Sequence, residues 1–291
     1  MLVGFTCPDV NGESPGRKNK PSYCIRHCKA PCVAPHVLAS MLEEESTNPH
    51  KGKIISVTQL VGGCKRKTFL ERTLDYYVTP DSKLPTFRGT MIHRVVEQAA
   101  KSTRMRRAKW LIEEHLELPC KTKSGEWLLS GTLDSYDPLR YTVFDIKTLQ
   151  DYAIERMLKG QEPGTWSKHI SDSYVKQLNL YGYMLRKIRK VKVKHLRLQI
   201  IGFGRLILTG TRVEYGWKDK RVYDLPDIPI LTDAEIESWI EKEGDLWYNI
   251  LFMGAAAPVY DDGFEWLCKK CIFLHSDMCL DPKSEKERFA V

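Results

Sequence analysis

Two acidic residues and a lysine lie close together in a predicted β-hairpin. Asp134 lies near the end of the segment EWLLSGTLDSYD, Asp145 and Lys147 lie in RYTVFDIKTL, and the turn-forming residues DPLR separate the two segments. Side chains alternate along a strand, so Asp145 and Lys147 project from the same face, and Asp134 can approach Asp145 across the hairpin. Two neighbouring carboxylates repel each other unless a cation lies between them.

This arrangement is a candidate site for a hard divalent cation, which takes one or two carboxylates and keeps several waters. A lysine beside the ion can stabilise developing negative charge or help to position an attacking water. Metal-assisted hydrolysis of a phosphodiester needs a polarised phosphate and an activated water. The pattern D-x-K is very common, however, and its alternative interpretation is a surface strand with ordinary salt bridges.

Two helical segments carry further candidate residues. In RGTMIHRVVEQ, His93 lies one helical turn before Glu97 on the same side. Gln177 and Tyr181 are four residues apart, so they share one face of a helix that continues into a basic run. Each feature alone also fits an ordinary helix, with a structural histidine in the first and a buried tyrosine stripe in the second.

Near the end of the chain, WLCKKCIFLHSDMCL holds a C-x2-C pair and a third cysteine, Cys268, Cys271 and Cys279. Most metal sites of this type need four ligands. In a reducing compartment, clustered cysteines indicate metal more often than disulfides. Four thiolates can hold either an iron–sulfur cluster or a zinc ion.

A second group of cysteines lies in the first part of the chain. Cys24, Cys28 and Cys32 are each separated by three residues, which is a looser spacing than in the usual zinc knuckle. Four cysteine ligands would form a separate zinc site and would explain how a segment with little core stays ordered. The alternative is a disordered, reactive tail. The residues are Cys7, Cys24, Cys28 and Cys32. Cys120 has no partner in the sequence and is expected to be a buried thiol.

Positive charge is concentrated in two segments. The chain has a formal net charge of +8, and KSTRMRRAKW and MLRKIRKVKVK contain no acidic residue. Either segment alone can be a solvated helix face, but the two together favour binding of phosphates. Trp166 could stack on an unpaired base or could serve only in a core or loop. The basic residues predicted to contact DNA are Arg104, Arg106, Arg107, Lys187 and Lys190.

The elements that would position these residues follow from periodicity and cap signals. Residues 1–35 read as an irregular extension and 75–87 as a connector. Thr232, followed three residues later by Glu235, predicts a helix start. The predicted order is helices at 56–74 and 88–116, a hairpin at 126–137 and 140–149, a helix at 170–190, two strands within 194–217, and a helix from 232. This order predicts an α/β core with a mixed central β-sheet flanked by helices.

Composition narrows the class of protein. Hydrophobic residues make up 42% of the chain, which is enough for a sizeable core. No stretch of apolar residues is long enough to span a membrane, and the first residues lack the order of a signal peptide. The expectation is a soluble protein in a reducing, cytoplasmic compartment, of unknown oligomeric state.

Taken together and in this order, four segments resemble the successive motifs of the RecB-like branch of the PD-(D/E)XK nucleases: GTMIH (89–93), GTLD (131–134), DIK (145–147) and QLNLY (177–181). The resemblance runs from about Ser56 to Cys279 and implies a restriction-endonuclease-like core. It implies a Mg²⁺ or Mn²⁺ site made by His93, Asp134, Asp145 and the backbone carbonyl of Ile146, with Lys147 as the catalytic lysine. It also implies that Gln177 and Tyr181 lie beside the active site and the DNA. Asp145 stands where many members have Glu, which is an accepted variation.

The segment SVTQLVGGCKR (56–66) resembles the part of this family that carries one cysteine ahead of the nuclease core. Iron–sulfur members include the CRISPR-associated RecB-like nucleases, the AddB nuclease domain and exonuclease V. In these proteins one cysteine before the core and three after it hold a [4Fe–4S] cluster. The resemblance therefore implies a C-terminal iron–sulfur clasp, for which zinc in the same ligands or scattered thiols are the alternatives. The implied ligands are Cys64, Cys268, Cys271 and Cys279.

These observations predict a Cys-rich extension at 1–50, a nuclease core at 51–265 and an iron–sulfur segment at 266–291. The expected function is a metal-dependent DNA nuclease, an exonuclease on single strands or ends, in recombination, replication, repair or CRISPR adaptation. The chain has no G-x-x-x-x-G-K-[ST] motif, so any helicase would be a partner. The alternatives are a nucleic-acid-binding adaptor with a decayed nuclease fold and an RNA-directed nuclease.

Overall fold

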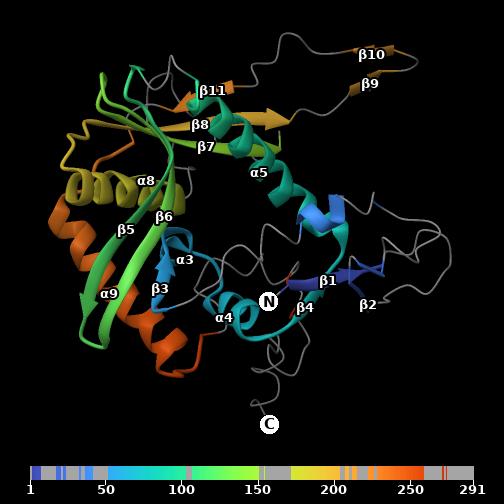
Figure 1. Ribbon diagram of the computed structural model, residues 1–291, viewed down its shortest axis with the longest axis horizontal. Helices are drawn as coiled ribbons and strands as arrows, with labels where there is room; N and C mark the ends of the chain where they lie inside the picture. Colours follow the sequence, from blue (N-terminus) through green and yellow to red (C-terminus); the bar gives the residue numbers. More distant parts are fainter. Residues whose placement is uncertain are drawn as a thin grey trace. The chain divides into compact units, whose positions relative to one another are not determined.

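Figure 1 shows the protein as a computed structural model, and the chain divides into two compact units. The first unit comprises Met1–Ile54, Gly62–Arg88 and Leu246–Val291, and the second comprises Ile55–Val61 and Gly89–Asp245. The structure describes residues 2–7, 18–20, 22–23, 33, 37–41, 52–102, 107–150, 154, 172–203, 207–209, 212–214, 222–225, 228–258, 271 and 273.

The second unit is built around a six-stranded mixed sheet. The strands follow the order β11-β8-β7-β6-β3, and β5 pairs with β6 outside this path. The pair β7–β8 is parallel, whereas β5–β6, β6–β7 and β8–β11 are antiparallel. The predicted α/β core with a mixed sheet flanked by helices is confirmed. The strands are β3 (Ile54–Ser56), β5 (Leu111–Thr122), β6 (Gly125–Asp137), β7 (Thr142–Gln150), β8 (His195–Phe203) and β11 (Val222–Leu225).

The predicted hairpin is confirmed as β6 and β7, which pair from Ser135 opposite Phe144 to Asp137 opposite Thr142. Its turn depends on Asp137, whose Oδ1 accepts the N–H groups of Leu139 at 2.9 Å and Arg140 at 3.3 Å. An aspartate that binds the backbone two residues ahead of it is a typical turn-former. The sequence DPLR therefore forms the turn through a local contact.

The helix predicted at 88–116 is wrong in its second half. Helix α5 (Pro80–Ala100) ends earlier, and strand β5 begins at Leu111. In β5, His115 and Glu117 are exposed and Leu116 is buried, which is the period of two that a strand requires. The predicted connector at 75–87 is also wrong, because β4 (Tyr76–Val78) and the first turns of α5 occupy it. Proline is well tolerated at the first helical position, where α5 has Pro80.

The helix predicted at 56–74 is two shorter helices, α3 (Val57–Val61) and α4 (Lys65–Thr73). The break between the two helices lies at the glycine pair. Gly63 has a φ of 94°, a conformation that glycine adopts without steric cost. Ser56 and Gln59 cap α3 reciprocally, with the Gln59 N–H 3.1 Å from Ser56 Oγ and the Ser56 N–H 3.0 Å from Gln59 Oε1.

The last predicted helices are confirmed. Helix α8 (Asp172–Met184) continues into one π-helical turn, η1 (Leu185–Arg189), and packs against β7 and β8. Helix α9 (Asp233–Phe252) begins at the expected cap, where the Glu235 N–H lies 3.2 Å from Thr232 Oγ1. Beyond β8, the short strands β9 (Ile207–Thr209) and β10 (Arg212–Glu214) form a hairpin. Within the described residues, no helix has the length and apolarity needed to cross a membrane.

The first unit has its own small sheet, β2-β1-β4, and its own core. Strand β1 (Leu2–Thr6) pairs antiparallel with β2 (Lys18–Asn19) and parallel with β4. The expectation of an irregular segment at 1–35 is therefore wrong for β1, which contributes a buried phenylalanine to the core. The buried core residues are Phe5, Leu38, Met41, Leu70, Tyr76, Val78 and Phe273, and Cys271 packs against them.

Candidate functional site

Three side chains from three elements of the second unit meet in a group that could hold a metal ion. His93 comes from α5, Glu113 from β5 and Asp134 from β6. His93 Nδ1 lies 2.8 Å from Glu113 Oε1 and 3.6 Å from Asp134 Oδ1. One ligand atom from each residue lies within 4.8 Å of the others. Carboxylates are ligands of hard divalent ions, and an imidazole nitrogen is a ligand of first-row transition metals.

Glu113 was not among the predicted site residues, because its segment had been interpreted as helix. The β5–β6 register places Ile112 opposite Ser135 and Glu114 opposite Leu133, so Glu113 lies across from Asp134. Its φ of 50° is unusual for a residue other than glycine. Such strained residues cost about 1–3 kcal/mol and cluster at functional sites. The alternation in LIEEHLEL could have revealed this glutamate, since it puts Glu113 on the polar face of a strand.

Asp134 is buried, with 6% of its surface exposed, and its Oδ2 accepts the N–H of Ile146. Burial and the neighbouring charge of Asp145 raise the pKa of Asp134 to about 7. A carboxyl group in this state needs a nearby positive charge to remain ionised at neutral pH. His93 supplies part of that charge, because its hydrogen bond to Glu113 outweighs its desolvation and raises the pKa of the imidazole.

Asp145 and Lys147 lie on one face of β7, as the alternation predicted. Lys147 Nζ donates to Asp145 Oδ1 at 2.8 Å. Asp145 Oδ2 also lies 2.8 Å from Nζ, so the ammonium group is paired with both oxygens of the carboxylate. Desolvation disfavours the charge on Lys147, but Asp145 and Asp134 outweigh it and raise the pKa of the lysine. Asp145 is 1% exposed, so Lys147 balances the charge of a buried carboxylate.

The glycine of GTLD has a packing role next to this cluster. A Cβ at Gly131 would lie 2.8 Å from Val57 Cγ2 and 2.9 Å from Tyr181 Cε1, so any other residue would require these side chains to shift. Tyr181 is 4% exposed. Burial raises the pKa of Tyr181 above its ordinary value. A hydrogen bond with Gln177 opposes this change, and the negative charges of Asp145 and Asp134 add to it. Gln177 and Tyr181 therefore lie beside the carboxylates, and their contact with DNA stays a prediction that requires the tyrosine to become accessible.

The predicted DNA-contacting basic residues differ in their surroundings. Lys187 Nζ lies 3.0 Å from Glu237 Oε1 and 3.4 Å from Asp233 Oδ2, so its charge is already balanced. Lys190 is exposed and ends η1 in a left-handed conformation. Arg107 is exposed. Arg104, Arg106 and Trp166 lie outside the described residues.

Two of the four cysteines predicted to hold the cluster are described, and both belong to the first unit. Cys64 is buried and caps α4, with its Sγ 3.5 Å from the Lys67 N–H. Cys271 is half-buried against the core of that unit. Cys268 and Cys279 lie outside the described residues.

Of the candidate zinc ligands, Cys7 is half-buried directly after β1. Cys24, Cys28 and Cys32 lie outside the described part of the chain. Cys120, which was expected to be a buried thiol, is half-buried in β5, and burial raises its pKa to about 11.

No protein-family model matches the sequence, and no curated protein matches it. Among solved structures, a chain titled "Crystal structure of SSO0001" is similar to this one, with 18% sequence identity and a TM-score of 0.49. The similarity covers 84% of this chain and 96% of that chain. The functional conclusion therefore depends on the residues of this chain.

Proposed function

We propose that the protein is a metal-dependent DNA nuclease of the RecB-like PD-(D/E)XK type, acting on single strands or DNA ends. The observation that carries the proposal is the convergence of His93, Glu113 and Asp134 within 4.8 Å, beside the ion pair of Asp145 and Lys147. A histidine, three acids and a lysine in this proximity are the groups that metal-assisted phosphodiester hydrolysis uses.

The residues fit a divalent ion such as Mg²⁺ or Mn²⁺, because Glu113 and Asp134 bring two carboxylates within 4.8 Å of His93 and Asp134 needs a positive neighbour. The ion would be held by His93, Asp134 and Asp145, with Glu113 and the carbonyl of Ile146 as further ligands. When bound, it would polarise the scissile phosphate and lower the pKa of a water.

The chain's own groups do the remaining work. Lys147 keeps its positive charge because Asp145 and Asp134 raise its pKa, so it can stabilise negative charge that develops on the phosphoryl oxygens. The ring of Tyr174 lies 5.5 Å from its ammonium group and limits where that group can point. Glu113 holds the His93 ring through Nδ1 and so determines its orientation.

We further propose a [4Fe–4S] cluster on Cys64, Cys268, Cys271 and Cys279, with zinc in the same ligands as the alternative. The proposal is supported by the membership of Cys64 and Cys271 in one compact unit and by the N–H donor to Cys64 Sγ. Hydrogen bonds to cysteine sulfurs are common around such clusters. Cys7, Cys24, Cys28 and Cys32 stay a separate proposal for zinc.

The nuclease proposal is tested by incubating end-labelled DNA and RNA strands with the protein and Mn²⁺, with and without EDTA. We expect cleavage of DNA that EDTA abolishes. Asp145→Asn and Lys147→Ala should each lower the rate by at least about a hundredfold while the fold is retained. Glu117→Gln is the matched control, because Glu117 is exposed on β5 beyond the cluster. Equal cleavage by all variants would refute the active-site assignment. Faster cleavage of RNA than of DNA would refute the proposal that DNA is the substrate.

A further inference from the structure

The basic run after α8 contains two kinds of positive charge. Arg186 is bound to Asp233, with 2.5 Å between Nη2 and Oδ1, and Lys187 is shared between Asp233 and Glu237. Arg189 pairs with Glu114. These three residues are therefore neutralised within the protein. Among the described residues, no carboxylate pairs with Lys190, Lys192 or Lys194, which we call the lysine row.

The lysine row is presented to solvent in a regular way. Lys190, Lys192 and Lys194 are exposed, whereas Val191 and Val193 between them are half-buried. Val193 faces α8, since its Cγ1 lies 3.5 Å from the position of a Cβ on Gly182. Such alternation is typical of an extended segment, in which residues two apart are separated by about 6.5 Å. Lys192 and Lys194 lie in this extended segment, and Lys190 precedes it in a left-handed conformation, so the row is three exposed lysines within five residues.

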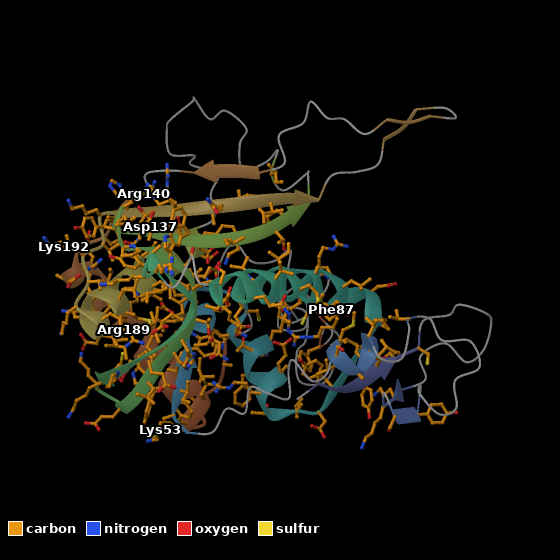
Figure 2. The ribbon with its side chains drawn as sticks, turned by 45° about the horizontal axis from the view of Figure 1, so that its top comes forward. Lys53, Phe87, Asp137, Arg140, Arg189 and Lys192 are labelled. Atoms are coloured by element: carbon orange, nitrogen blue, oxygen red, sulfur yellow. The ribbon has the colours of Figure 1, made fainter. Side chains whose placement is uncertain are left out.

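The backbone of the row is held in place by the β6–β7 turn. Tyr136 Oη donates to the Lys192 carbonyl at 2.7 Å, and the Lys194 N–H donates to the Tyr141 carbonyl at 2.8 Å. The ring of Tyr141 also lies 5.1 Å from the Lys194 ammonium group. Figure 2 shows Lys192 on the same side of the molecule as Arg140, whose exposed guanidinium is held by Asp137 at 2.7 Å. Little backbone entropy would be lost when the row binds a partner.

We infer that the lysine row binds successive phosphates of the DNA strand, outside the catalytic cluster. Three neighbouring exposed lysines that have no carboxylate partner among the described residues suit a polymer with several phosphates better than a single small anion. Lysine binds phosphate as a point charge and does not read the bases, so the contact is independent of sequence. The inference rests on the proposed function, because the bound polymer is the substrate of that reaction.

The test measures the binding of DNA separately from its cleavage. It therefore uses the Asp145→Asn variant as the parent protein and a buffer without divalent ions. The row variant carries K190Q, K192Q and K194Q. The control carries K53Q, K67Q and K121Q, which remove the same charge from lysines that contact Tyr248, Glu71 and Glu126 and are not among the residues predicted to contact DNA. Binding of a fluorescent single strand is followed by anisotropy between about 50 and 200 mM salt.

In the row variant we expect the slope of log affinity against log salt to become shallower by about 2, since three phosphate contacts on a single strand contribute about 0.7 each. When the salt concentration rises over that range, the affinity of the parent should fall by a factor roughly 20 times larger than the factor by which the affinity of the row variant falls. The control variant should keep the parent's slope. Thermal unfolding of all proteins verifies that each is folded.

Equal changes in both variants, or no change in either, would overturn the lysine row while leaving the nuclease proposal intact if the parent chain cleaves DNA. Retained binding with the expected slope change, in a chain that cuts no DNA, would support the row and refute the nuclease. Failure of the parent to bind DNA would overturn the row as well. Competition by polyglutamate as effective as by DNA would indicate an acidic protein partner and would also overturn it.

Discussion

At the scale of single residues, Glu113 has the clearest role that only the tertiary structure reveals. It lies across from Asp134, hydrogen-bonds His93 at 2.8 Å and has an unfavourable backbone conformation. A side chain that both orients a ligand and can itself bind the ion should affect metal affinity directly.

Glu113→Gln should therefore weaken Mn²⁺ binding by about tenfold to a hundredfold, as removal of such partners does elsewhere. Binding is measured by calorimetry on the DNA-free protein and by the Mn²⁺ dependence of cleavage. Glu117→Gln, four residues further along the same strand, should leave both quantities unchanged. Identical behaviour of the two variants would remove Glu113 from the site.

Cys120 offers a prediction about pH. Its S–H group donates to the Leu118 carbonyl at 3.5 Å, and burial raises its pKa to about 11. The thiol is therefore protonated in the folded protein where an unfolded chain would begin to ionise, so its contribution to stability is present at neutral pH and is lost as the pH rises towards 11.

Alkylation of Cys120 by iodoacetamide at about pH 8 should be at least about a hundredfold slower in the folded protein than in urea, because the thiolate is the reactive form. Peptide mapping by mass spectrometry measures the rate for this cysteine alone. Fast modification of Cys120 in the folded protein would show that burial does not protect it.

At the scale of elements, the contact between β6, α3 and α8 depends on the absence of a side chain at Gly131. Gly131→Ala should lower the free energy of unfolding by about 1–3 kcal/mol, because Val57 and Tyr181 must move to make room. Gly89→Ala in α5 is the matched control. Among the described residues its new Cβ would meet only Thr148 Oγ1, at 3.7 Å, and alanine favours helix by about 1 kcal/mol.

The two glycine variants should thus change stability in opposite directions, as measured by urea unfolding. Loss of stability in both would mean that the spacing around Gly89 is tighter than this contact indicates. No loss in Gly131→Ala would mean that Tyr181 is not fixed against β6.

At the scale of the whole molecule, two described cysteines of the first unit come from chain segments that are far apart in the sequence. Cys64 begins α4, and Cys271 packs on the core that contains Leu70 of the same helix. A shared metal would close a very long loop, and such a link can add several kcal/mol to stability.

Purified without oxygen, the protein should be brown, and Cys271→Ala should remove the colour and lower the unfolding temperature. Cys120→Ala should keep the colour, because Cys120 belongs to the second unit. Visible absorption together with iron and zinc analysis measures this outcome. A colourless protein with one zinc per chain would replace the cluster by the zinc alternative.

Local patterns in the sequence predicted the hairpin, the shared face of Asp145 and Lys147, and the start of α9. Each depends on residues within a few positions, so strand alternation, turn chemistry or a capping box is sufficient. The same local reasoning failed for residues 101–116. It predicts one continuous helix there, whereas the helix ends at Ala100 and a strand begins at Leu111.

Tertiary structure decided what depends on residues far apart. It brought Glu113 across from Asp134, excluded a side chain at Gly131, and separated the neutralised Lys187 from the exposed Lys190. Whether a charge is compensated depends on partners such as Glu237, fifty residues away on another helix. The sequence alone determined which groups were available for metal and phosphate chemistry, and their long-range contacts determined which of them act together.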